Sequence, residues 1–160
     1  MTTALTLRVA VVNDIPALVS HRRRMFEDMY ADKAVVRDRV AYEAMDTAYA
    51  DILRYEIPAG STRAWVIDDG GIIAASGALK FTDWLPRPDG QRRGLVYVHS
   101  VYCVPEYRRQ GLARRILQAM IGYCRDNGWP RISLHASDMG RDLYEELGFV
   151  PTNEMRLVLE

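Results

Sequence analysis

The chain has 160 residues, of which 49% are hydrophobic and 26% charged, and its 21 Lys and Arg residues balance 21 Asp and Glu. This size and composition predict one globular domain over residues 1–160. The balanced charge argues against a nucleic-acid partner, because such domains usually carry a basic excess. No stretch approaches the ~20 apolar residues that span a bilayer, and no signal-peptide pattern is visible, so we expect a cytoplasmic protein without a membrane partner.

The first third of the chain predicts one strand and two helices. Residues 5–12 predict the strand, and Asn13-Asp14 can cap a helix that continues to about Met29. A second helix is predicted over residues 37–55, with Pro58 in the segment that ends it.

The middle of the chain predicts antiparallel strands. Residues 63–67 and 72–81 are strand-like, and the Asp-Asp-Gly-Gly sequence at 68–71 predicts a hairpin turn between them. A loop is predicted over residues 84–90. The Val- and Tyr-rich residues 95–104 predict the next strand.

The last third predicts alternating helices and strands. Residues 111–126 carry apolar side chains at helical spacing, and residues 137–147 predict a short helix. Residues 131–135 and 155–159 predict strands, the first of them parallel to its predecessor through a right-handed crossover. The order is β-α-α-β-β-β-α-β-α-β, which predicts an α/β (α+β) fold with a mixed sheet.

The turn between residues 104 and 112 has the spacing Arg108-x-x-Gly111-x-Ala113 and is predicted to open a helix directly after a strand. The first N–H groups of a helix lack internal partners and lie at its positive end, so they can bind an anion such as a phosphate. Gly111 permits close backbone approach. Nearby arginines add positive charge: Arg108, Arg109 and Arg114. A glycine that merely eases a tight turn is the alternative. The chain lacks the glycine-rich loops of nucleoside triphosphate and dinucleotide sites.

Two segments resemble the GNAT N-acetyltransferase superfamily. VHSVYCVPEYRRQGLARRIL, residues 98–117, is similar to its coenzyme A motif, and ISLHASDMGRDLYEELGFVP, residues 132–151, is similar to its next motif, which contains Leu-Tyr-Glu-x-Leu-Gly-Phe. The resemblance implies the GNAT fold, with a bulge that splays the sheet at the strand before the turn, and acetyl-CoA as acyl donor. It places the pantetheine arm along Val101, Tyr102 and Cys103. The pyrophosphate would lie on the turn, at Arg108, Arg109, Gln110, Gly111, Leu112, Ala113 and Arg114.

The resemblance also implies the catalytic groups. Tyr144 would protonate the leaving thiolate, although an aromatic ring that packs on the sheet is the simpler alternative. His99 is the candidate general base, with a pH–activity limb expected near 6–7, and His135 is a weaker candidate. We interpret His21 as a surface residue within a basic run and Cys103 as ordinary packing. Ser137 stands where many relatives have Asn. No metal-ligand spacing is present, so no metal is expected.

The acceptor amine is expected between the first two helices and the last strands, with candidate contacts at Arg23, Phe26, Met29, Tyr30 and Asn153. It would be a small-molecule or peptide amine. The alternatives are a non-catalytic acyl-CoA sensor or an enzyme that acts on a protein N-terminus or lysine. A homodimer is an open alternative for the assembly.

Overall fold

The protein is described by a computed structural model that covers residues 4–33, 38–88 and 94–159. The predicted start of the second helix at residue 37 and the predicted loop residues 89–90 lie outside these ranges. The elements in chain order are β1 (Thr6–Val9), η1 (Val12–Asp14), α1 (Ile15–Tyr30), α2 (Arg39–Ala59), β2 (Thr62–Asp69), β3 (Ile72–Thr82), β4 (Leu95–Cys103), η2 (Pro105–Tyr107), α3 (Leu112–Asp126) and α4 (Arg141–Glu146).

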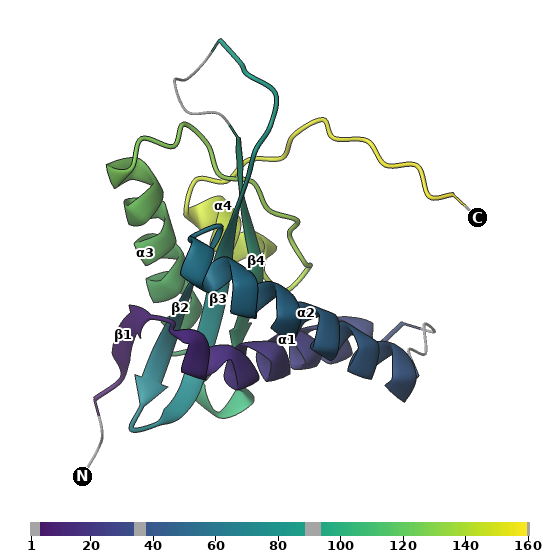
Figure 1. Ribbon diagram of the computed structural model, residues 1–160, viewed down its shortest axis with the longest axis vertical. Coiled ribbons are helices and arrows are strands. Elements are labelled where there is room, and N and C mark those ends of the chain that lie inside the picture. Colours follow the sequence, from purple (N-terminus) through teal and green to yellow (C-terminus); the bar gives the residue numbers. More distant parts are fainter. Residues whose placement is uncertain (1–3, 34–37, 89–93, 160) are drawn as a thin grey trace.

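The four strands form one antiparallel sheet in the order β1-β2-β3-β4 (Figure 1). The predicted hairpin between β2 and β3 is confirmed, and its turn is closed by the Gly71 N–H, which donates to Asp68 Oδ1 (2.7 Å). Helix α2 runs through Pro58 and ends at Gly60, whose φ of 78° is the left-handed conformation that closes many helices.

Helices cover both faces of the sheet, as the alternation of side chains in β2 requires. Ala64 and Val66 pack in a core cluster with Leu18 and Leu53 of α1 and α2. Trp65 and Ile67 point the opposite way, into a second cluster. The residues that α3 adds to this second cluster are Leu112, Ile116, Leu117, Met120 and Cys124.

Strand β4 contains a bulge, as the resemblance implied. Ser76 pairs with Tyr102 and Ala78 with His99, so Ser100 and Val101 of β4 face one residue of β3. Ser100 has a φ of 55°, a left-handed conformation that non-glycine residues seldom adopt. The bulge bends β4 just after Tyr97, the residue that forms the bridge to Ser133.

Two predicted strands do not form among the described residues. Residues 131–135 contribute a single parallel bridge, between Ser133 and Tyr97, so the expected mixed sheet is reduced to one parallel contact beside an antiparallel sheet. The segment 155–159 extends away from the sheet (Figure 1), and Met155 and Leu157 are 94% and 81% exposed. Alternating apolar residues predicted a strand there, but a strand needs a hydrogen-bonded neighbour, and this segment has none within the described ranges.

The short helix predicted over 137–147 is confirmed in its second half only, as α4. Its first residues form turns, in which the Gly140 N–H donates to Ser137 Oγ (3.2 Å). Across the described ranges, no helix has the length and apolar character needed to cross a bilayer.

Candidate functional site

A cavity of about 400 Å³, here called cavity A, lies between β4, the turn before α3, and α4. It brings together every residue predicted to bind the cofactor except Gln110. Its lining comprises Met25, Asp28, Met29, Val101, Tyr102, Cys103, Arg108, Arg109, Gly111, Leu112, Ala113, Arg114, Ser137, Met139, Gly140, Leu143 and Tyr144.

The turn before the N-terminus of α3 has the geometry of an anion site. Arg109 and Gly111 both adopt left-handed φ angles, 61° and 73°, and a Cβ placed on Gly111 would meet no atom within 4 Å. The first helical hydrogen bond joins the Arg115 N–H to Gly111 O (3.0 Å). The N–H groups of residues 112–114 therefore lack intrahelical acceptors, and they lie at the positive end of a 15-residue helix.

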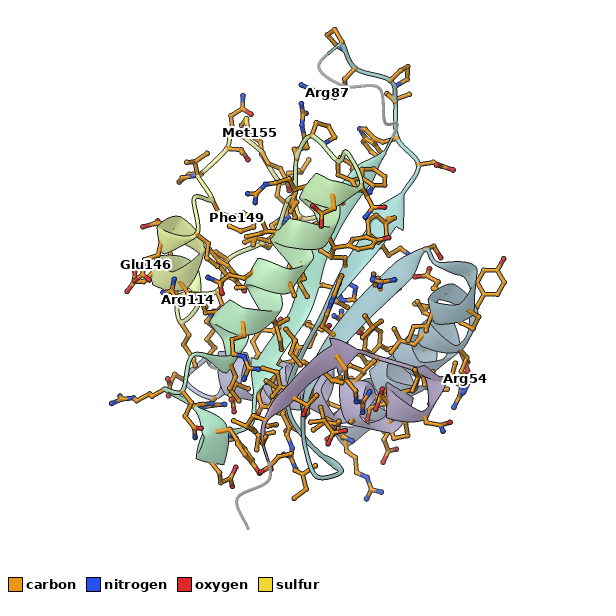
Figure 2. The ribbon with its side chains drawn as sticks, turned by 90° about the vertical axis from the view of Figure 1, so that its left-hand side faces the viewer. Arg54, Arg87, Arg114, Glu146, Phe149 and Met155 are labelled. Carbon is orange, nitrogen blue, oxygen red and sulfur yellow. The ribbon has the colours of Figure 1, made fainter. Side chains whose placement is uncertain are left out.

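The arginines of cavity A are held by neighbouring groups. Arg108 donates from Nε to Cys103 O (3.0 Å) and from Nη2 to Asp28 Oδ2 (2.7 Å). Arg114 of α3 forms an ion pair with Glu146 of α4, and the two side chains lie next to each other in Figure 2. Arg108 thus connects the turn to β4 and α1.

A second cavity of about 310 Å³, here called cavity B, lies between α1, β4 and the segment after α3. It is lined by Arg22, Met25, Phe26, Met29, Tyr97, Val98, His99, Ser100, Val101, Leu134, His135, Ser137, Tyr144 and Arg156. Cavities A and B share five of these residues: Met25, Met29, Val101, Ser137 and Tyr144. The two cavities are therefore adjacent.

Tyr144 lies at this junction, and its surroundings fix the ring. Its centroid is 5.9 Å from that of Phe149 in an edge-on contact, and a Cβ on Gly140 would come within 2.8 Å of Tyr144 Cε2. Burial raises the pKa of the Tyr144 hydroxyl, with a smaller effect from Tyr97. The hydroxyl consequently keeps its proton at neutral pH and can act as a donor.

His99 lines cavity B rather than cavity A, because the bulge changes the alternation of β4. Its ring meets Tyr49 of α2 edge-on at 6.0 Å, whereas Val101 and Cys103 pack in the cluster on the α3 face. A hydrogen bond joins His99 Nδ1 and Ser100 Oγ (3.0 Å). Burial, followed by the charges of Arg22 and Lys80, lowers the pKa of His99 to about 4. With this environment, an activity limb near 6–7 is not expected from His99.

The other two histidines occupy different environments. His21 is buried, which corrects the surface interpretation, and its Nδ1 shares a hydrogen bond with Ser76 Oγ (2.8 Å). His135 lines cavity B and is hydrogen-bonded to the Tyr97 hydroxyl. Burial raises the pKa of the Cys103 thiol, which agrees with a packing role.

Of the residues predicted to contact the acceptor, Phe26 and Met29 line cavity B. Arg23 lies outside it, in ion pairs with Asp46 and Glu27, and Tyr30 stacks on Phe26 at 5.9 Å without lining either cavity. Asn153 lies in the exposed C-terminal segment.

Sequence reasoning missed Arg22, which does line cavity B. Helical spacing could have identified it, because Arg22 follows the core residue Leu18 by four positions and precedes Phe26 by four, so the three lie on one face of the helix.

A family model described as "Acetyltransferase (GNAT) family" matches residues 21–149. The chain belongs to this acetyltransferase (GNAT) family. The match begins in α1 and ends just after α4, so it includes the turn before α3, the lining of cavity A, and the lining of cavity B except Arg156.

Known proteins agree with this membership. The protein named "Probable N-acetyltransferase family 8 member 5" from Mus musculus is 29% identical over 122 residues, or 74% of this chain and 51% of the mouse protein. The chain thus spans about half the length of that curated relative. A crystal structure of a GCN5-related N-acetyltransferase from Ralstonia eutropha has a TM-score of 0.86 at 26% identity, over 98% of this chain and 99% of that one. A predicted acetyltransferase with acetyl-CoA from Clostridium acetobutylicum shares the GNAT fold, with a TM-score of 0.85 at 23% identity over 98% and 96%.

Proposed function

We propose that this chain is an acetyl-CoA-dependent N-acetyltransferase that transfers an acetyl group to a primary amine by direct attack in a ternary complex. One observation carries the proposal: cavities A and B meet at Tyr144 and Val101. A thioester held in cavity A and an amine held in cavity B would meet beside a tyrosine hydroxyl.

The residues of cavity A fit both the pyrophosphate and the pantetheine arm of a CoA thioester. Acetyl-CoA bound there would supply an activated acyl group. The free N–H groups of residues 112–114, with Gly111 open above them, suit the pyrophosphate. Past the bulge, no described strand pairs with Val101, Tyr102 and Cys103 on the edge away from β3. That edge leaves backbone groups for the amides of a pantetheine arm, which would add to the sheet as an extended peptide does.

In this proposal, Tyr144 protonates the leaving sulfur. In direct transfer, an N–C bond forms as the C–S bond breaks, the amine loses one proton and the sulfur gains one. Because burial keeps the Tyr144 hydroxyl protonated, it can give its proton to the developing thiolate and stabilise its charge. The nucleophile must be a neutral amine. His99 with a pKa of about 4 is a weak base, so we favour an acceptor that enters cavity B already neutral.

The test is release of free thiol from acetyl-CoA across a panel of amines, with Tyr144→Phe beside the wild type. The variant loses only the hydroxyl, so kcat should fall by roughly 10²–10⁴ while the KM for acetyl-CoA changes little. Tyr55→Phe is the matched control, because Tyr55 is 77% exposed on α2 and lines neither cavity. Binding of acetyl-CoA without turnover of any amine would favour the sensor, and an unchanged kcat in Tyr144→Phe would remove this tyrosine from the chemistry.

A further inference from the structure

Cavity B has an unusual charge for a site that receives an amine. Its lining includes the guanidinium groups of Arg22 and Arg156 and the imidazoles of His99 and His135, and it includes no Asp or Glu. Cationic polyamines are normally bound by carboxylates, which this lining lacks. Arg156 is paired with Glu154 and His99 has a pKa of about 4, so Arg22 dominates the charge of this lining. The electrostatic potential beside Arg22 opposes an ammonium group and attracts an anion.

Arg22 is the principal charge of this cavity. Its Nη1 donates to Ser100 Oγ (2.8 Å), and its guanidinium carbon lies 4.8 Å from the ring centroid of Tyr49 and 5.1 Å from that of Phe26. These contacts hold the guanidinium between α1, α2 and the bulge of β4. They leave its remaining N–H groups for other acceptors.

Unlike Arg23 and Arg108, Arg22 has no carboxylate partner among the described residues. Arg23 pairs with Asp46, and Arg108 pairs with Asp28. A partly buried guanidinium without a counter-ion is costly, and a bidentate anion would satisfy it. Arg156, at the other side of the cavity, is already paired with Glu154.

The same charge affects the amine. A positive charge a few ångströms from an ammonium lowers the pKa of that ammonium, which favours the neutral nucleophile. After burial, which is the larger cause, the charge of Arg22 lowers the pKa of His99 in this way. An anionic group bound to Arg22 would offset this effect, so Arg22 is assigned only to binding the anionic end of the acceptor.

Resting on the proposed function, we infer that the acceptor is a small amine that also carries a carboxylate or phosphate, and that Arg22 binds this anionic group in cavity B. The volume of about 310 Å³ suits a molecule of the size of an amino acid or a phosphorylated amino sugar. In this assignment Arg22 determines which acceptor binds, and Tyr144 protonates the leaving sulfur during acetyl transfer.

Matched pairs of acceptors test the inference. Glycine with glycinamide probes the carboxylate, glucosamine 6-phosphate with glucosamine probes the phosphate, and putrescine represents cationic amines. For at least one pair, the anionic member should have a kcat/KM on the order of 10- to 100-fold higher, and putrescine should be poorer still. Arg22→Met should remove most of that ratio by acting on the anionic member, whereas Arg22→Lys should retain part of it. Arg24→Met, an exposed neighbour outside both cavities, is the control and should keep the wild-type ratio.

Calorimetric binding of the same pairs to the protein saturated with CoA provides a readout that needs no turnover. Tighter binding of an anionic member, lost in Arg22→Met, would support the inference even if no thiol were released, and the proposed function would then fail alone. Equal binding and equal kcat/KM within both pairs would overturn the inference, as would a preference for putrescine. An equal loss in Arg22→Met for both members of the preferred pair would also overturn it.

Discussion

The buried histidine of α1 makes the stability of this protein sensitive to mild acid. His21 is 4% exposed, its Nδ1 shares a hydrogen bond with Ser76, and its ring lies 5.2 Å from that of Tyr102. Burial, and to a lesser degree the charge of Arg24, lowers the pKa of His21 from 6.5 to about 4. The folded protein therefore keeps this imidazole neutral at a pH where the unfolded chain already protonates it.

The size and sign of the effect follow from that shift. Above pH 6.5 both states are neutral and His21 contributes no pH dependence. Between pH 6.5 and about 4 the unfolded state binds the proton more tightly, so the free energy of unfolding falls by up to about 3 kcal/mol and levels off below that window. His99, whose pKa is also about 4, adds a dependence of the same sign over the same window.

Urea unfolding of the wild type and His21→Gln at several pH values between 7 and 4.5 measures this. The variant keeps a polar group for Ser76 but cannot titrate. Its free energy of unfolding should therefore fall less steeply with acid, and the difference from the wild type is the contribution of His21. If His21→Gln and wild type lose the same free energy between pH 6.5 and 4.5, the argument from burial is refuted.

Three other substitutions probe the candidate site. Gly111→Asp should weaken CoA binding measured by calorimetry, because a carboxylate enters the anion site and Asp must adopt a φ of 73°; equal affinity would dismiss the site. Gly140→Ala places a methyl group 2.8 Å from the Tyr144 ring, so steady-state assays should show a lower kcat with little change in CoA affinity, and an unchanged kcat would mean that the ring position is unimportant. His99→Gln should leave the pH–rate profile between 6 and 7 unchanged, since the pKa of His99 is about 4; loss of a limb in that range would contradict this environment.

The sequence predicted best where local chemistry decides the structure. The Gly70-Gly71 turn, the helix that follows Gly111 and the tyrosine of α4 each depend on neighbouring residues, and each was located correctly. Strands depend on partners far away in the chain. Residues 131–135 and 155–159 have the right alternation, but the first finds only one bridge beside Tyr97 and the second finds no strand to join in the described ranges.

The charge of cavity B was missed for a different reason. His21 and Arg22 lie in a His-Arg-Arg-Arg run, which is typical of a solvated surface, yet they follow Leu18 by three and four positions and so share its inward face. The orientation and pKa of His99 could likewise not be predicted from the sequence. Its face depends on the bulge, and its pKa depends on burial and on Arg22, which is distant in the chain.

Ser100 acts as a spacer within β4. Before it, His99 faces the helical layer of α1 and α2; after it, Val101 returns to the α3 layer and Tyr102 contacts His21 of α1. Without Ser100, these three side chains would keep their present faces in regular alternation, and Val101 would pair one-to-one with Gly77. The hydrophobic layers therefore do not require the extra residue. What a one-residue deletion would remove is the bend of the strand and the hydroxyl that holds Arg22, so the length of this strand is matched to the cavities and not to the core.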